Sequence, residues 1–254
     1  MKSYGISDIG YVRSNNEDAW AELPAYKFFV LADGMGGHQA GEVASKEAVE
    51  RLSSQIEELY QKAPPKAATE LRAAIERVNR EIYQLSLKNR RYAGMGTTLV
   101  CFLVCGESLI YAHVGDSRIY RFRDKCLTKL TQDHSLREEL LGKGKLKAES
   151  TPVGAFKNII TRAIGTHADV QPEIESTQLM DGDIYFLCSD GLTDELSTEE
   201  MSSILLKAKT IKEASDSLVS AAKAKGGNDN ITIVMVQAST HEKNLLRQQR
   251  EQRA

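Results

Sequence analysis

Apolar side chains recur along this chain with two different periods, which predict its strands and helices. Short runs rich in β-branched and aromatic residues cover residues 27–32, 97–104 and 183–189, which favours buried strands. Residues 39–60 instead place apolar side chains on one helical face, and a second helix is predicted over residues 71–85. Up to the second run, the predicted order is therefore strand, two helices, strand.

The second half of the chain extends this order. Residues 108–114 and 117–122 are apolar runs on either side of a Gly-Asp pair, which predicts a β-hairpin. Ser197 is followed three residues later by Glu200, the capping-box pattern that begins a helix. Another helix is predicted over residues 211–224, and a final apolar run predicts the last strand.

Pairs of helices between groups of strands indicate the fold class. This order argues for an α+β protein with stacked layers, because a doubly wound fold would alternate single helices with parallel strands. No internal repeat or low-complexity linker interrupts residues 1–238, so we expect a single domain there. Residues 142–166 have a mixed composition that predicts a loop excursion, and residues 239–254 predict a polar tail.

Composition and charge exclude several classes of protein. The 254 residues are 41% hydrophobic and carry a formal net charge of -2, so there is no basic field to attract nucleic acid. The N-terminus lacks an apolar signal core, and no run approaches the ~18 apolar residues of a membrane span. We expect a cytoplasmic monomer without membrane insertion, whose four cysteines are small buried side chains.

Carboxylates stand at the ends of several apolar runs. An aspartate at a strand end is held by a rigid scaffold yet reaches solvent, which suits a binding site. Near the N-terminus, the stretch RSNNED adds Glu17 and Asp18. Hard oxygen ligands without nearby Cys or His favour Mg²⁺ or Mn²⁺ over zinc. The strand-end residues that would form such a cluster are Asp33, Asp116, Asp190 and Asp229.

Each of these residue types also has a purely structural interpretation. Asp-Gly is a strong turn signal, and we interpret Asp181 and Asp183 as turn residues before a strand rather than ligands. Arg13 is either half of a surface ion pair or a bidentate clamp on an anion such as phosphate. Two divalent ions together with an arginine clamp would suit phosphoester hydrolysis.

Eight motifs stand in order along the chain and together carry a family resemblance. They are RSNNEDA (13–19), LADGMGGHQAGEVAS (31–45), GTTLV (96–100), AHVGDSRIYR (112–121), TQDHS (131–135), ITRAIG (160–165), CSDGLTD (188–194) and GGNDNITIV (226–234). Together they resemble the metal-dependent Ser/Thr protein phosphatases, the protein phosphatase 2C family, in its compact bacterial branch. Each motif is weak alone, but the combination is highly specific and covers roughly residues 1–238.

The resemblance implies a fold and a metal centre. The fold would be a four-layer αββα sandwich, with two stacked antiparallel sheets flanked by helix pairs and the metals between the sheets at one end. Asp33 would bridge two ions of Mn²⁺ or Mg²⁺, with the Gly34 carbonyl on one of them. Asp190 and Asp229 would hold the second ion, and Asp116 with Asp190 a third, weaker one.

The resemblance also assigns the remaining site residues. Glu17 and Asp18 would act largely through metal-bound waters, and Arg13 would bind the substrate phosphate. Many eukaryotic members carry DGHGG, whose His is proposed to protonate the leaving oxygen. Met35 stands at that position here, and His38 either takes over this role or caps the following helix.

The implied activity is hydrolysis of phosphoserine and phosphothreonine in proteins by direct attack of a metal-bridging hydroxide. The implied partners are phosphorylated proteins, among them a cognate bacterial Ser/Thr kinase and its substrates. Residues 142–160 correspond to the flap that covers the site in bacterial members. This Lys-rich stretch either meets the phosphopeptide or is a solvated loop.

Two other classes of function compete with this interpretation. A non-catalytic module that binds phosphorylated partners would be expected to lose metal carboxylates, yet Asp33, Asp190 and Asp229 are all present. The third class is a phosphohydrolase of small phosphate esters, or a developmental regulator of the same fold. Activity on a phosphothreonine peptide against a small ester discriminates between these classes.

Overall fold

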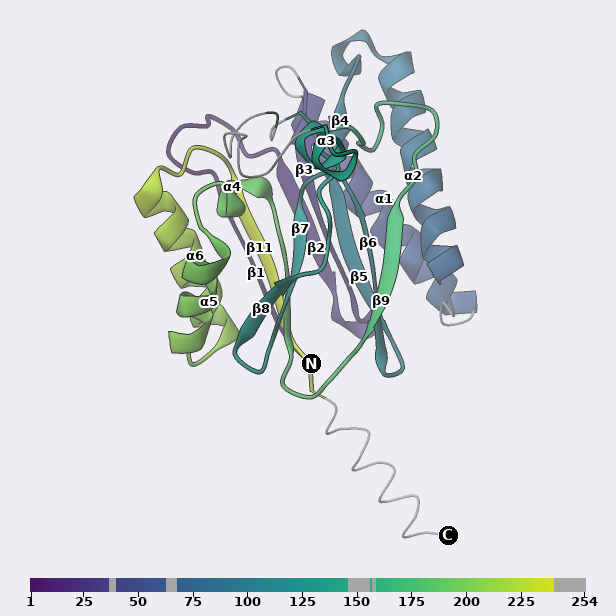
Figure 1. The fold of residues 1–254 in the computed structure, drawn as a ribbon. Coiled ribbons are helices and arrows are strands. Elements are labelled where there is room, and N and C mark those ends of the chain that lie inside the picture. Colours follow the sequence, from purple (N-terminus) through teal and green to yellow (C-terminus); the bar gives the residue numbers. More distant parts are fainter. Residues whose placement is uncertain (37–39, 63–67, 146–155, 157–158, 240–254) are drawn as a thin grey trace, which may run out of the picture.

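Two antiparallel sheets lie face to face at the centre of the molecule, and helices cover their outer faces (Figure 1). The computed structural model describes residues 1–36, 40–62, 68–145, 156 and 159–239. This arrangement confirms the predicted α+β class and the four layers that the family resemblance implied.

The two sheets have five and six strands. The first sheet, in spatial order, consists of β1 (Lys2–Asp8), β11 (Ile231–Gln237), β10 (Ile184–Cys188), β7 (Arg118–Arg123) and β8 (Cys126–Lys129). The second consists of β2 (Asp18–Leu23), β3 (Phe28–Met35), β5 (Leu99–Cys105), β6 (Ser108–Val114) and β9 (Glu173–Gln178), with β4 (Gly96–Thr97) paired to β3. All of these pairings are antiparallel.

Each sheet carries its own helix pair. The second sheet is covered by α1 (Ala40–Lys62) and α2 (Ala68–Lys88), and the first sheet by α5 (Thr198–Lys207) and α6 (Ile211–Lys225) (Figure 1). The short helices α3 (Leu136–Gly142) and α4 (Asp190–Thr193) lie near the end of the sandwich opposite the N-terminus (Figure 1). These bounds confirm the four long helices that the apolar periods predict.

Local sequence signals explain where α5 begins. The Ser197 side chain accepts a hydrogen bond from the Glu200 N–H, and the Glu200 carboxylate accepts one from the Ser197 N–H. This is the predicted capping box, which satisfies two backbone donors that the first helical turn leaves unpaired.

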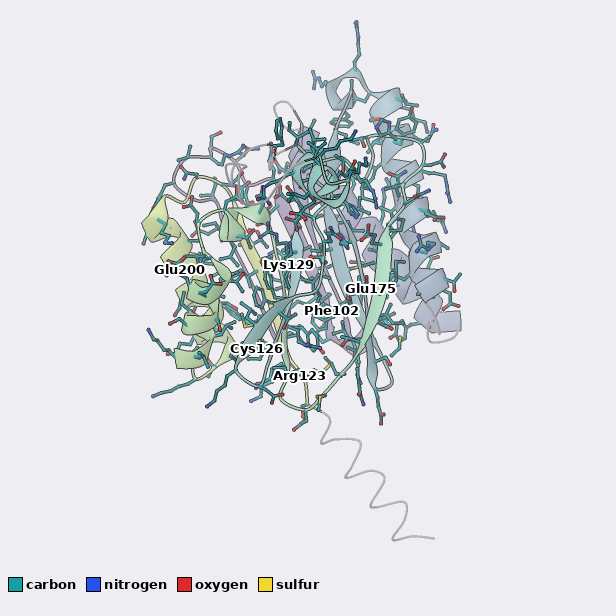
Figure 2. The ribbon with its side chains drawn as sticks, viewed as in Figure 1. Phe102, Arg123, Cys126, Lys129, Glu175 and Glu200 are labelled. Atoms are coloured by element: carbon teal, nitrogen blue, oxygen red, sulfur yellow. The ribbon has the colours of Figure 1, made fainter. Side chains whose placement is uncertain are left out.

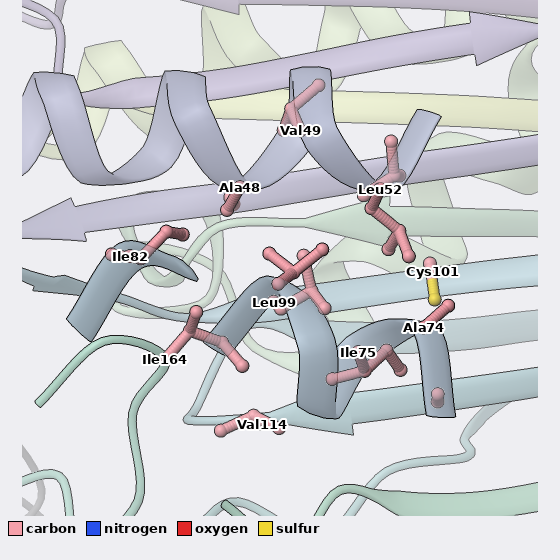
Figure 3. Packing of buried hydrophobic residues seen from close by; sticks show 14 of the residues in the cluster. Ala48, Val49, Leu52, Ala74, Ile75, Ile82, Leu99, Cys101, Val114 and Ile164 are labelled. Carbon is pink, nitrogen blue, oxygen red and sulfur yellow. The ribbon is translucent and has the colours of Figure 1, made fainter. Parts of the chain in front are cut away.

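The core has one apolar layer between each pair of structural layers. Figure 3 shows how Leu52 of α1 and Ile75 of α2 pack against Leu99 and Cys101 of β5. Aromatic rings help to fill the layer between the sheets, where Phe102, labelled in Figure 2, lies 6.2 Å from the ring of Tyr185. Burial of such side chains, worth about 1.5–3 kcal/mol each, fixes the separation of the sheets.

The predicted hairpin over residues 108–122 is wrong. β6 pairs with β5 and β9 in the second sheet, whereas β7 pairs with β10 and β8 in the first sheet. The link between them crosses from one sheet to the other, and Gly115 adopts a φ of 102° there, a conformation that glycine favours. The hairpin prediction failed because two apolar runs around a Gly-Asp pair look the same in sequence whether the strands pair with each other or belong to different sheets. As a consequence, Asp116 lies between the two sheets.

Four strands escaped the sequence analysis, namely β1, β2, β8 and β9. Their residues are mostly half-buried or exposed, so they lack the continuous apolar runs of the central strands. The cysteine expectation was only half right, since Cys101 and Cys188 are buried but Cys105 is half-buried and Cys126 exposed.

Several sequence expectations fall partly outside the described residues. Most of the predicted flap over residues 142–160 and nearly all of the tail over residues 239–254 lie there. Among the helices that the structure does describe, none is long and apolar enough to cross a membrane.

Candidate functional site

A pocket at one end of the sandwich brings most of the predicted site residues together. Seven of them line it, namely Arg13, Glu17, Asp33, Gly34, Asp116, Asp190 and Asp229. The rest of the described lining consists of Met35, Gly36, Ile160 and Asn230. Asp18 lies directly behind this lining, and His38 falls outside the described residues.

The sheet topology explains why residues so distant in sequence meet here. β2 and β3 pair with Asp18 opposite Asp33, so these two carboxylates belong to neighbouring strands of the second sheet. β10 and β11 pair in the first sheet, where Asp190 follows β10 and Asp229 precedes β11. Because antiparallel neighbours bring the end of one strand beside the start of the next, Asp190 and Asp229 share one edge. Asp116 lies on the link that crosses from one sheet to the other, and it completes the carboxylate lining of the pocket.

Close backbone packing requires a glycine directly after Asp33. A Cβ on Gly34 would collide with the Gly41 carbonyl oxygen at the start of α1. The Gly34 N–H donates to the Glu17 carbonyl oxygen at 3.0 Å, which ties β3 to the segment before β2. Gly36 has a φ of 150°, which lets the chain bend directly after β3. Only glycine at position 34 lets helix α1 begin this close to Asp33.

Two hydroxyls hold Asp18 in place. Ser189 Oγ donates to Asp18 Oδ2 at 2.8 Å, and Thr232 Oγ1 donates to the same oxygen at 2.6 Å. The other oxygen, Asp18 Oδ1, is buried and finds no hydrogen-bond partner among the described residues. Sequence reasoning missed Ser189 and Thr232, although each stands beside or near a predicted ligand in the motifs CSDG and GGNDNITIV.

A second hydroxyl pair connects Asp33 to the turn that carries Asp116. Thr98 Oγ1 accepts a hydrogen bond from the Asp33 N–H at 2.9 Å and lies 2.7 Å from Ser117 Oγ. The Thr98 N–H donates to the Asp33 carbonyl oxygen at 2.8 Å. This buried link joins the two sheets at the pocket, and the sequence analysis did not predict it.

Burial and mutual repulsion raise the pKa values of the clustered carboxyls. Burial, then the charges of Asp116 and other carboxylates, raises the pKa of Asp190 to about 8. Burial raises the pKa of Asp18 to about 6, even though the two hydroxyls oppose this shift. Asp116 rises to a pKa of about 6, chiefly through burial, and burial and four neighbouring carboxylates raise the pKa of Asp33 well above its ordinary value. Without a cation, the site therefore does not stabilise full ionisation of these carboxyls.

A divalent cation fits this set of donors. Asp116 Oδ1, like Asp18 Oδ1, is buried and has no hydrogen-bond partner among the described residues. Unpartnered buried carboxylate oxygens are costly, and coordination to a metal is one of the few ways to satisfy them. An all-oxygen set without Cys or His matches the preference of Mg²⁺ or Mn²⁺.

Arg13 lies at the rim of the pocket. Its Nη2 contacts Asp229 Oδ2 at 2.6 Å, while half of its side chain stays exposed. The first of the two interpretations of Arg13, a surface ion pair, is therefore present as its contact with Asp229. Its position inside the lining is also compatible with the other interpretation, because the guanidinium has five donors and this contact uses only part of them.

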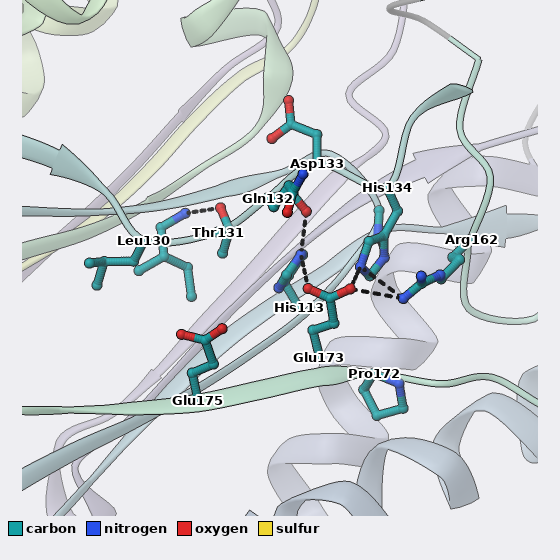
Figure 4. Close-up of polar contacts among 12 residues, drawn as sticks. His113, Leu130, Thr131, Gln132, Asp133, His134, Arg162, Pro172, Glu173 and Glu175 are labelled. Atoms are coloured by element: carbon teal, nitrogen blue, oxygen red, sulfur yellow. Dashed lines mark hydrogen bonds and ion pairs between the residues drawn. The ribbon is translucent and has the colours of Figure 1, made fainter. Parts of the chain in front are cut away.

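The buried histidines His113 and His134 form a polar cluster with Glu173 and Arg162 (Figure 4). The rings of His113 and His134 stack with centroids 4.4 Å apart, and His134 Nε2 lies 3.1 Å from Glu173 Oε1. His134 Nδ1 accepts a hydrogen bond from the Gly115 N–H, which places the proton of the neutral ring on Nε2. Burial, then the neighbouring His113, lowers the pKa of His134 to about 4, so the ring is neutral. The cluster braces the turn that carries Asp116, because His134 Nδ1 accepts the Gly115 N–H one residue before it.

The expected turn role of Asp183 also agrees with the structure. Its carboxylate forms an ion pair with Arg123 at 2.6 Å and accepts a hydrogen bond from the Met180 N–H at 2.9 Å. Both contacts lower the pKa of Asp183, although burial opposes them. This Asp-Gly-Asp turn thus contributes nothing to the pocket.

Comparisons with known proteins converge on one family. A sequence profile described as Protein phosphatase 2C matches residues 11–229. The serine/threonine phosphatase stp of Listeria monocytogenes is 36% identical over 241 residues, which cover 93% of this chain and 96% of that protein. The crystal structure of PstP/Ppp, a serine/threonine phosphatase of Mycobacterium tuberculosis, is similar with a TM-score of 0.84 at 34% identity, covering 94% of this chain and 98% of that one. A PstP catalytic domain in complex with two manganese ions has a TM-score of 0.81 at 34% identity, with coverage of 94% and 98%.

Proposed function

This chain belongs to the protein phosphatase 2C family and is a metal-dependent serine/threonine protein phosphatase, and from this premise we propose which of its residues carry the reaction. Its substrates are phosphoproteins. The observation that carries the proposal is the convergence of Asp18, Asp33, Asp116, Asp190 and Asp229 on one end of the sandwich, with two buried carboxylate oxygens unpartnered among the described residues.

We propose that these carboxylates hold two ions of Mn²⁺ or Mg²⁺. Asp33 stands between the two sheets and would bridge the ions, with the Gly34 carbonyl oxygen as a further donor. Asp190 and Asp229 would hold the second ion, and Asp116 with Asp190 a third, weaker one. Glu17 and Asp18 would act through water, Asp18 being oriented by the hydroxyls of Ser189 and Thr232. The manganese pair in the PstP catalytic domain supports the choice and number of the first two ions.

The bound ions would lower the pKa of a water molecule and offset the negative charge of the phosphoryl oxygens. Arg13 would bind and orient the phosphate, since it lines the pocket while half of its side chain stays exposed. The buried walls would exclude bulk water and so strengthen these electrostatic interactions.

The proton donor for the leaving oxygen remains a prediction from the sequence. His38 is our candidate, with a helix-capping role as its alternative. His38→Ala decides between them: slower turnover with an altered pH profile indicates the donor, and wild-type kinetics leave His38 as a cap.

Three further predictions from the sequence concern partners, location and domain organisation. We propose that a cognate Ser/Thr protein kinase and its substrates are the partners, that the enzyme acts in the cytoplasm as a monomer, and that residues 1–238 form one domain. Recovery of the kinase with a metal-deficient Asp33→Ala variant, but not after dephosphorylation of the kinase, would support the first of these.

Phosphate release from a phosphothreonine peptide tests the proposal. After removal of metal by a chelator, we expect turnover to be restored by Mn²⁺ or Mg²⁺ in the wild type and lost in Asp33→Ala. Turnover by a folded Asp33→Ala variant at the wild-type rate would refute the assignment of the pocket. Selective turnover of a small ester, with the peptide untouched, would instead favour the small-ester phosphohydrolase.

A further inference from the structure

Exposed apolar side chains gather on the segments that border the pocket. Eight large apolar residues are exposed in the described part of the chain, and three of them lie on the loop between β1 and β2. These three, Ile9, Tyr11 and Val12, are 39%, 69% and 65% exposed and are called the apolar rim below. The next residue along the chain is Arg13, which lines the pocket. Apolar groups presented this openly beside a site indicate an interaction surface.

The backbone of this loop is held in a fixed shape. The Tyr11 N–H donates to the Gly227 carbonyl oxygen at 2.8 Å, and Asn230 Nδ2 donates to the Ile9 carbonyl oxygen at 3.0 Å. Asn230 itself lines the pocket, so the loop and the pocket share one support. A surface that is already ordered binds at a lower entropic cost than a loop that must become ordered.

Gly10 allows the loop to lie directly against the pocket wall. It has a φ of 79°, and a Cβ there would collide with the Asp229 carbonyl oxygen. The Tyr11 ring lies beyond it, with Lys223 Nζ 4.8 Å from the ring centroid. The rim therefore continues the surface of the pocket from Arg13 toward the C-terminal end of α6 (Figure 1).

A second part of the pocket border is also apolar. Ile160 lines the pocket and pairs with Ser135, and its neighbour Ile159 is 49% exposed. A chain segment bound at the pocket would thus have apolar side chains of two separate segments within the pocket border.

We propose that the apolar rim is a docking surface for the substrate peptide and selects phosphopeptides with an aliphatic or aromatic side chain within two residues of the phosphorylated one. Two residues of chain span at most ~7 Å, so Tyr11 is within that distance of Arg13, the same reach as a substrate residue two positions away. A second folded protein is a poorer fit, since three side chains offer far less than the ~800 Å² per partner of a stable interface. This inference rests on the proposed function, because it places the phosphate beside Arg13.

Paired peptides test it with metal-loaded enzyme. Two phosphothreonine peptides of equal charge carry Leu or Ser at the positions within two residues of the phosphothreonine. We expect kcat/KM to be about 10-fold higher for the Leu peptide in the wild type, the effect of burying an aliphatic side chain. In the double variant Tyr11→Ser, Val12→Ser we expect this ratio to fall to near 1.

Control variants separate the rim from general effects. Leu206→Ser removes a side chain of similar exposure, 51%, on the distant helix α5 and should leave the ratio unchanged. Tyr11→Phe keeps the ring and should keep the preference. Equal kcat/KM for both peptides in an active wild type would overturn the rim proposal while leaving the phosphatase site intact. Hydrolysis of neither peptide by wild type with Mn²⁺ would contradict the proposed function itself.

Discussion

Strand β10 carries an aspartate at each end, and the two have opposite fates. Asp183, just before the strand, is 2% exposed and is held by Arg123 at the end of the sandwich near the N-terminus (Figure 2). Asp190, just after the strand, has other carboxylates as its nearest charges. The contacts lower the pKa of Asp183, whereas burial raises that of Asp190 to about 8. One end of the sandwich is electrostatically complete, and the other is built to receive cations.

The same sequence signal, an aspartate in an Asp-Gly turn, has two different chemical outcomes at the two ends of β10. Both aspartates precede a glycine or stand in an Asp-Gly turn beside an apolar strand. What differs is the partner, because an arginine on the neighbouring strand satisfies Asp183 and no described cation other than Arg13 lies in the pocket lining around Asp190. The local motif reports the turn, and the sheet topology decides the chemistry.

Exchange of each carboxylate for an amide should have the largest effects, on activity at Asp190 and on stability at Asp183. Asp190→Asn should lower kcat by at least ~10³-fold through loss of metal binding, while the chelated protein becomes no less stable because Asn resembles the protonated carboxyl that the metal-free pocket favours. Asp183→Asn should keep kcat but lower the free energy of unfolding by about 2–3 kcal/mol, since it leaves Arg123 without its partner. Kinetics and denaturant unfolding measure the two effects, and loss of activity in Asp183→Asn would undo the distinction between the ends.

The hydroxyls that donate to Asp18 should affect the metal affinity of the pocket. Thr232→Val removes the donor 2.6 Å from Asp18 Oδ2 and should weaken Mn²⁺ affinity about 10-fold. Thr232→Ser keeps the hydroxyl and serves as the matched control. Calorimetric titration of the metal decides, and equal affinity in all three proteins would mean that the hydroxyls only pack.

Arg13 should affect substrate rather than metal. We expect Arg13→Ala to raise KM for a phosphopeptide about 10-fold, because a bidentate phosphate contact is lost. Arg13→Lys keeps the charge but not the planar guanidinium, so its KM should lie between those of the wild type and Arg13→Ala. An unchanged KM in Arg13→Ala would leave this residue as a surface ion pair with Asp229.

The pH dependence of stability should have opposite signs at the two ends. In chelated protein the folded-state pKa values of Asp18, about 6, and Asp190, about 8, exceed their ordinary value of 3.8. Their contribution to stability is therefore full below about pH 4 and is lost as the pH rises toward 8. The lowered pKa of Asp183 does the reverse, contributing above its ordinary value and losing this contribution as the pH falls.

Thermal unfolding of chelated protein measures this dependence. We expect the wild-type Tm to fall by about 5 °C or more as the pH is raised from 5 to 8, and Asp190→Asn to flatten that slope. A wild-type Tm that rises over this range would show that the pocket carboxylates do not repel one another.

The sequence predicted the central strands and long helices because their apolar periods are strong. It missed β1, β2, β8 and β9, whose side chains are largely half-buried or exposed, and it joined β6 to β7 because nothing local distinguishes a hairpin from a crossing between sheets. The same limit applies at the site. Asp33 and Asp190 were found from their strand ends, whereas the hydroxyls of Ser189 and Thr98 acquire their roles only through contacts between distant segments.

The most direct measurement is the titration of Mn²⁺ into chelated protein near pH 7, repeated in buffers with different ionisation heats to count the protons released. We expect tight binding with proton release in the wild type and in Asp183→Asn, since its raised pKa leaves Asp190 largely protonated before the metal enters. We expect strongly weakened binding in Asp190→Asn. Equal binding by all three proteins, or binding by the wild type without proton release, would contradict the claim that the crowded carboxylates of this pocket form the metal centre.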